Sequence, residues 1–193
     1  ETVAHHFSHG DLDDKATAYA MRAAERAAAR WANAEALAFF ETALRRLEGM
    51  QPTETVRLQR IDLVLRQSEV RFALGHHADQ LAALTRIGPL LTDEDGASRR
   101  ASWHYWIGFL NSITGGGSDV SITNCRRASE IAQEAELEEL VASADCGLAQ
   151  GYMIGGELRQ ALEMVERAVR GFERRGNPWW ACRTLAQLSP AAS

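Results

Sequence analysis

Apolar residues recur every three or four positions along nearly the whole chain, which is the spacing that gathers side chains on one face of an α-helix. Gly, Pro and acidic residues interrupt this pattern at short intervals, and no stretch alternates like a half-buried strand. We therefore predict an all-α fold. The short loops between the helices predict that successive helices are antiparallel neighbours. The expected helices cover residues 2–8, 13–30, 33–48, 54–74, 78–91, 98–113, 119–135, 138–154, 158–175 and 178–188.

A three-residue pattern returns in four of these helices. Its members are spaced by four and then three residues, which keeps them on one helical face. The four copies are Ala36-Phe40-Ala43, Gln80-Leu84-Ile87, Ser121-Cys125-Ala128 and Ala161-Val165-Ala168. Their last members are 44, 41 and 40 residues apart, so the repeating unit is a helix pair of about 40 residues. Two copies open with polar Gln80 and Ser121, which predicts looser or shifted packing there.

The fourth unit resembles the tetratricopeptide repeat in its middle section. The residues that carry the resemblance are Leu148, Ala149, Tyr152, Gly156, Ala161, Val165 and Ala168. The period is longer than the 34 residues usual for this repeat, which indicates the long-helix variant. The resemblance implies an α-solenoid of antiparallel helix pairs, a TPR-like superhelix. We expect one array over residues 1–193, with units at about 13–48, 54–91, 98–135 and 138–175 and partial helices at both ends.

The opening of the chain is similar to the start of the tetratricopeptide region in large bacterial signalling proteins. These proteins join an ATPase module to the repeats, and many also carry an adenylate/guanylate cyclase domain or a DNA-binding domain. The similarity rests on Ala4-His5-His6-Phe7, Gly10-Asp11-Leu12, Lys15-Ala16 and Ala32-Asn33-Ala34-Glu35-Ala36-Leu37. It implies that the ATP chemistry lies upstream of Glu1 and that the repeats transmit a regulatory signal. We therefore interpret the chain, from Glu1 to Ser193, as part of a longer protein.

The charge and composition of the chain limit the classes of partner that it could bind. A net charge of -5 without any Lys/Arg-rich run argues against nucleic acid or an anionic membrane as the main partner. No apolar run reaches the ~20 residues of a membrane-spanning helix. Three cysteines lie far apart, at Cys125, Cys146 and Cys182, and form neither a disulfide framework nor a zinc motif. A cytoplasmic location is the expectation.

No catalytic motif is recognisable, so we expect no enzyme activity and no cofactor in this chain. The Gly115-Gly116-Gly117-Ser118 run lacks the Lys of a phosphate-binding loop. His5 and His9 share a helix face beside His6, but zinc needs more ligands than these positions supply. We interpret the three histidines as packing or capping the N-terminal helix rather than as a metal site.

The function that the repeat resemblance favours is a scaffold for protein–protein or interdomain contacts. In such arrays the first helix of each pair lines a concave groove, which would bind a protein segment or another domain of the parent chain. Three acids in the inferred groove, and no Lys or Arg, predict a ligand with basic as well as apolar groups. The candidate groove residues are Met21, Glu25, Asp62, Glu69, Phe72, Tyr105, Phe109 and Gln150.

Alternatives remain at this point. A shift of one residue in the third unit would replace Tyr105 and Phe109 in the groove with Trp106 and Leu110. The chain could also be a small-molecule sensor with a pocket near Trp103, Trp106 and Phe72. A third reading is a spacer or homodimerisation element of an ATP-dependent transcriptional regulator. For Trp103 and Trp106 themselves, we expect a role in the core.

Overall fold

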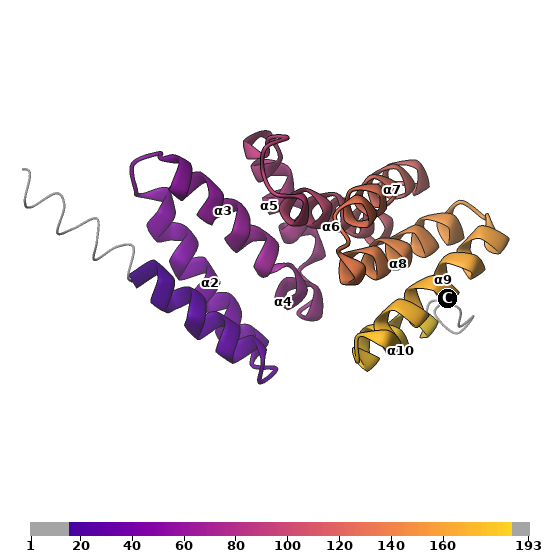
Figure 1. Ribbon diagram of the computed structural model, residues 1–193. Helices are drawn as coiled ribbons and strands as arrows, with labels where there is room; N and C mark the ends of the chain where they lie inside the picture. The colour runs from indigo at the N-terminus through magenta and orange to yellow at the C-terminus, as the bar shows by residue number, and fades with distance from the viewer. Residues whose placement is uncertain (1–15, 187–193) are drawn as a thin grey trace, which may run out of the picture. The chain divides into compact units, whose positions relative to one another are not determined.

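The computed structural model describes residues 16–186, and within this range the regular structure is helical throughout (Figure 1). The predicted all-α class is confirmed, and the expected helices 33–48 and 138–154 match residue for residue. The expected helix 2–8 and the start of 13–30 lie outside the described residues. The helices are residues 16–28, α2 (Asn33–Glu48), α3 (Glu54–Arg66), α4 (Ser68–Ala73), α5 (His77–Ile87), the 3-10 turn η1 (Gly88–Leu90), α6 (Ala97–Thr114), α7 (Ser118–Glu134), α8 (Glu138–Ile154), α9 (Leu158–Arg174) and α10 (Pro178–Ala186).

The described chain forms two compact units, whose border in the sequence lies between Ala83 and Leu84, inside α5. Each unit has its own packed helices and is considered by itself. None of the helices described in either unit is both long and apolar enough to cross a membrane.

The first unit is built on close contacts between small residues. Ala24 and Ala27 of helix 16–28 are buried in the same cluster as Ala36 and Ala43 of α2. Small side chains let helix backbones approach each other, while the larger Phe40 fills the remaining space. The same cluster extends to Val56 and Leu63 of α3 and to Val70 of α4.

A break at Gln67 divides the predicted helix 54–74 into α3 and α4. The side chain of Gln80, from α5, donates from Nε2 to the Val64 carbonyl at 2.8 Å and to the Ser68 hydroxyl at 2.7 Å. In a continuous helix the Val64 carbonyl would accept from the backbone N–H of Ser68. A polar group that inserts into this ladder is a recognised cause of a helix kink. Although Gln80 is polar, it occupies a buried position of the repeat pattern, because its side chain donates hydrogen bonds where α3 ends and α4 begins.

In the second unit, consecutive helices from α6 to α10 pack against one another, and α6 also contacts α8. These helices approach each other closely at Cys125 of α7. A β-carbon added at Gly108 of α6 or at Gly147 of α8 would lie 2.6 or 2.5 Å from its sulfur, closer than real atoms approach. Glycine at both positions therefore lets α6 and α8 close around α7.

Aromatic rings fill the interior where α10 packs. Trp180 stacks on Phe172 of α9 with 6.0 Å between ring centroids, and its ring meets Trp106 of α6 edge to face at 6.4 Å. The predicted core role of Trp106 is confirmed by its burial. Trp103 is half-buried, and its Nε1 donates to the Leu84 carbonyl at 2.9 Å.

The repeated three-residue pattern marks the interior in both units. Each of its twelve residues is at most 4% exposed, including the polar ones. The predicted interior face of these helices is therefore confirmed. The four copies are Ala36-Phe40-Ala43, Gln80-Leu84-Ile87, Ser121-Cys125-Ala128 and Ala161-Val165-Ala168.

One type of turn ends several of the helices. After α7, α8 and α9, a residue with positive φ follows the helix: Glu136 at 55°, Gly156 at 78° and Gly176 at 66°. The next backbone N–H then bonds back to a carbonyl five residues earlier, as from Leu137 to Ala132 at 2.8 Å. This pattern is the Schellman motif, in which glycine is preferred because it has no β-carbon. Glu136 therefore adopts a strained conformation.

The shared turn gives a matched pair of substitutions. We expect Glu136→Gly to stabilise the fold and Gly156→Ala to destabilise it, each by about 1 kcal/mol, because both positions have the left-handed backbone that glycine adopts without strain. A β-carbon at Gly156 would meet no atom within 4 Å, so steric clash does not contribute. Urea unfolding of the three proteins measures both effects. Shifts of the same sign would contradict the assignment.

The buried face of α9 predicts a second contrast. Ala161 is 1% exposed, whereas its neighbour Leu162 is 49% exposed. We expect Ala161→Glu to lower the free energy of unfolding by several kcal/mol, roughly 3 or more, since it forces a carboxylate into a tight helix contact. Leu162→Glu is the control, with an expected change of less than about 1 kcal/mol. Equal thermal midpoints for the two variants would mean that this face is not buried.

Candidate functional site

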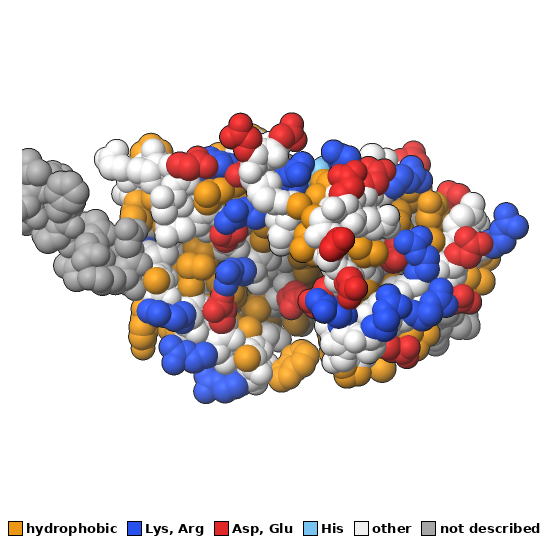
Figure 2. Space-filling model, in the orientation of Figure 1, with side chains coloured by type: hydrophobic (Ala, Val, Ile, Leu, Met, Phe, Trp, Pro, Cys, Tyr) orange, Lys and Arg blue, Asp and Glu red, His pale blue; other side chains and the backbone are white. Residues whose placement is uncertain are grey.

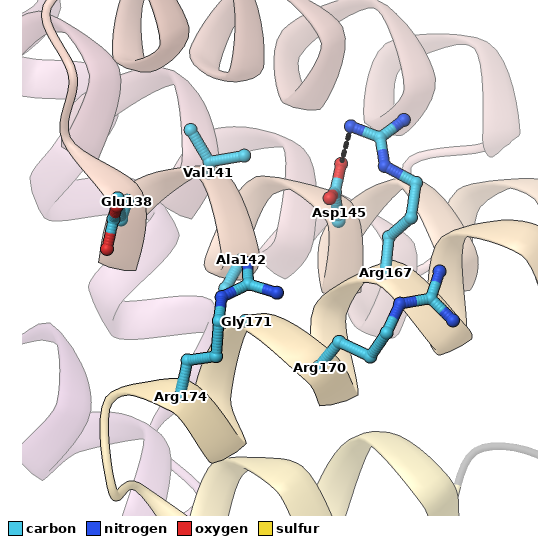
Figure 3. Close-up of a pocket in the computed structure, with 8 residues that line it drawn as sticks. All are labelled: Glu138, Val141, Ala142, Asp145, Arg167, Arg170, Gly171 and Arg174. Carbon is cyan, nitrogen blue, oxygen red and sulfur yellow. Dashed lines mark ion pairs between the residues drawn. The ribbon is translucent and has the colours of Figure 1, made fainter.

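An open pocket of about 220 Å³ lies between α8 and α9 in the second unit (Figure 3). Five of the residues that line it are charged, which is unusual for the seam between two packed helices. From α8 come Glu138, Val141, Ala142 and Asp145, and from α9 come Arg167, Arg170, Gly171 and Arg174.

Helical spacing explains how these residues meet. Glu138 and Asp145 are seven residues apart on α8, so they lie two turns apart on the same face. Arg167, Arg170 and Arg174 follow the spacing of three and four residues on α9, which aligns them in one row. Figure 3 shows this row on the side of α9 that faces α8.

The two helices approach each other closely at Gly171 and Ala142, which both line the pocket. A β-carbon at Gly171 would lie only 2.7 Å from the β-carbon of Ala142. The small residues at this point therefore let α9 pack against α8. This contact holds the arginine row at a fixed place along α8.

Asp145 is the most unusual group of the site. It is only 2% exposed, and its Oδ1 forms an ion pair at 3.2 Å with Nη2 of Arg167. The same oxygen accepts no hydrogen bond from the described residues. Burial raises the pKa of Asp145 to about 6, and the nearby Arg167 opposes this shift without cancelling it.

Arg170 and Arg174 are held more loosely. Arg170 pairs at 3.5 Å with Glu166, and both side chains are exposed. Arg174 has no ion pair with any residue in the range 16–186. Exposed pairs contribute little free energy, so both guanidinium groups can exchange their contacts for a ligand. In Figure 2, basic side chains gather over α9.

This arrangement suits an anion such as a planar carboxylate or a tetrahedral phosphate. Guanidinium groups bind carboxylate and phosphate through paired N–H donors, and three of them converge on one pocket. The described residues contain no group of three His, Cys, Asp or Glu that could hold a metal ion. The three guanidinium groups support recognition of an anion by charge and hydrogen bonds.

A second hollow, of about 300 Å³, lies between α6 and α7. Here His104 shares a hydrogen bond with Asn124 at 3.0 Å, and burial lowers the pKa of its imidazole. Two arginines line this hollow: Arg126 donates to the Tyr152 hydroxyl, and Arg127 forms an exposed pair with Glu130. The α8–α9 pocket is the better candidate for anion binding because three arginines line it.

The structure also locates the predicted groove residues of the first unit. Met21 and Asp62 are half-buried, Glu25 and Glu69 are exposed, and Phe72 is buried. Glu25 forms an ion pair with Arg66 of α3. The expected excess of acid is thus reduced by a basic partner that the groove pattern had not included, and the argument for a basic ligand weakens.

In the second unit, two predicted groove residues lie elsewhere than expected. Tyr105 and Phe109 are 3% and 1% exposed, and their rings stack at 5.5 Å. They belong to the packed interior because burying aromatic rings removes much apolar area from water. The shifted alternatives Trp106 and Leu110 are buried as well. Gln150 is half-buried.

The pocket residues were not singled out from the sequence. The usable signal was the spacing of Arg167, Arg170 and Arg174, which places three like charges on one face of a helix. Glu138 lies in the first turn of α8, where an acid also favours the start of a helix. The cluster of His5, His6 and His9 lies outside the described residues.

Comparison with known protein families and with curated proteins finds no match to this chain. The geometry of the pocket therefore carries the functional argument.

The buried carboxylate makes a prediction about stability. Since the pKa of Asp145 is about 6 in the folded chain and near 4 in unfolded chains, its contribution is most favourable below pH 4 and is lost as the pH rises through 6. We expect Asp145→Asn to raise the free energy of unfolding at pH 7.5 by about 1 to 2 kcal/mol.

The gain should shrink at pH 4.5, where Asp145 is already protonated in the folded chain. Arg167 is 43% exposed and stays hydrated after the substitution. Urea titrations at the two pH values measure the effect. A variant that is less stable than wild type at pH 7.5 would show that the ion pair outweighs the burial of the charge.

Proposed function

We propose that this chain is a protein-interaction scaffold of the helical-repeat type, which binds an acidic segment of a partner protein at the α8–α9 pocket. The observation that carries the proposal is the row of Arg167, Arg170 and Arg174 on one pocket wall. A carboxylate of the partner would accept hydrogen bonds from two of these guanidinium groups. The ligand charge is thus opposite to the one that the groove residues predicted.

Two features support the repeat character. The interior pattern recurs at intervals of 40 to 44 residues and is buried in every copy, and the same turn closes successive helices. Repeat arrays of this kind commonly serve as binding surfaces. We propose the long-helix tetratricopeptide type, with the chain acting as the regulatory region of a larger signalling protein that has cyclase or ATPase activity elsewhere.

The same chemistry serves a partner segment from the parent protein and one from another chain. The proposal assigns no catalysis to the described pocket, and it includes neither nucleic acid nor a membrane as ligand. Charge steering would speed the encounter and weaken as salt rises.

A charge-reversal experiment tests this function. The probe is a capped peptide of four Asp and four Gly residues that carries a dye insensitive to pH, and fluorescence anisotropy measures its binding. We expect Arg170→Glu with Arg174→Glu to weaken binding at least about tenfold, because attraction becomes repulsion. The control is Arg22→Glu with Arg26→Glu, an exposed pair with the same spacing on helix 16–28.

The control variant carries the same net charge, so its affinity should stay within about twofold of wild type if the pocket is the site. Equal losses in both variants would mean non-specific attraction and would refute the proposal. An excess of the free dicarboxylate glutarate distinguishes a small-molecule site from a peptide site. Complete displacement of the peptide at low millimolar glutarate would favour the sensor alternative.

A further inference from the structure

Asp145 stands where a ligand carboxylate would bind. It is buried, it pairs with Arg167, and its Oδ1 accepts no hydrogen bond from the described residues. An ionised carboxylate at this place competes with a ligand carboxylate for Arg167, and it also repels the ligand carboxylate. The pocket is therefore not equally open to anions in both protonation states of Asp145.

We propose that Asp145 is the specificity-determining residue of the pocket, an internal competitor that yields Arg167 to a partner carboxylate when it takes up a proton. This inference rests on the proposed function. When Asp145 is ionised, the five charged lining residues carry a net charge of one positive unit. When Asp145 is protonated, the net charge rises to two, and its hydroxyl can donate a hydrogen bond to the bound carboxylate.

The surroundings of Asp145 identify it as the titrating group. The charged residues that line the pocket with it are Glu138 from α8 and Arg167, Arg170 and Arg174 from α9. Burial raises its pKa, and Arg167 opposes this rise. The other lining residues are Val141, Ala142 and Gly171, which carry no charge.

On α6, which packs on another side of α8, burial lowers the pKa of His104, and its ring shares a hydrogen bond with Asn124 of α7. From α7, the thiol of Cys125 faces Gly147, and burial raises the pKa of this thiol, so it stays neutral. Also from α7, Arg126 donates a hydrogen bond to the Tyr152 hydroxyl of α8. From α6, the ring of Tyr105 lies against Gly147, and from α10 the hydroxyl of Thr184 donates to Cys146 at 3.4 Å.

The size of the effect follows from the fraction of protein in the competent state. With a pKa of about 6, binding to the protonated form alone would strengthen the affinity about 25-fold between pH 7.5 and pH 5.5. Partial exclusion gives a smaller factor, and we expect at least about fivefold. The Asp side chains of the probe stay ionised over this range, since their pKa is near 4.

The experiment measures binding of the same Asp–Gly peptide at pH 5.5, 6.5 and 7.5 to wild type and to Asp145→Asn. We expect the wild type to gain affinity as the pH falls, and the variant to bind tightly with little change. Both proteins contain the same histidines, so the difference between their profiles isolates Asp145. Identical pH profiles would overturn the inference.

A second variant guards against misfolding of the first. Arg167→Gln removes the group for which the two carboxylates compete, so we expect weaker binding at pH 5.5. We also expect a smaller change with pH, because loss of Arg167 raises the pKa of Asp145 further and keeps more of it protonated over this range. If this variant keeps the wild-type profile, the inference fails. Absence of peptide binding to wild type at every pH would instead refute the proposed function itself. Thermal midpoints of all proteins confirm that each is folded.

Discussion

The contact of Cys125 with two glycines is the constraint on which the second unit depends. Its sulfur lies between Gly108 of α6 and Gly147 of α8, at distances that exclude a β-carbon on either side. A thiol is small enough for this space and apolar enough to lose its water without cost. Any larger residue at one of the three positions would push the helices apart, because a packed interior cannot absorb an added methyl group without strain.

This contact also fixes which way α8 faces. Three consecutive residues of α8 point to three different helices: Asp145 to Arg167 of α9, Cys146 to Thr184 of α10, and Gly147 to Cys125 of α7. Rotation of α8 about its axis would therefore disrupt all three contacts together. The buried carboxylate of the pocket is held in place by the same packing that closes α6 and α8 around α7, so the site inherits its geometry from the core.

The fold was largely predictable because its signals are local. Helical periodicity located most helices, and a pattern spaced by four and three residues identified the buried face in each copy. The break at Gln67 was not predictable, since it depends on Gln80, which is distant in sequence and supplies hydrogen bonds to the helix end. In the sequence, Gln80 stands out as a polar residue at an apolar position of the repeat pattern. Its role becomes clear only from its hydrogen bonds to Val64 and Ser68.

The site was much harder to predict, because its meaning depends on pairing between helices. Arg167, Arg170 and Arg174 could be placed on one face from their spacing alone, and three exposed arginines on a helix are usually just a solvated surface. What changes their meaning is Asp145, whose burial follows from the position of α8 among α6, α7 and α9. Without that burial its carboxyl group would titrate near pH 4 and remain hydrated. In the packed helix it instead forms an ion pair with Arg167. In the proposed function, a partner carboxylate competes with Asp145 for this arginine.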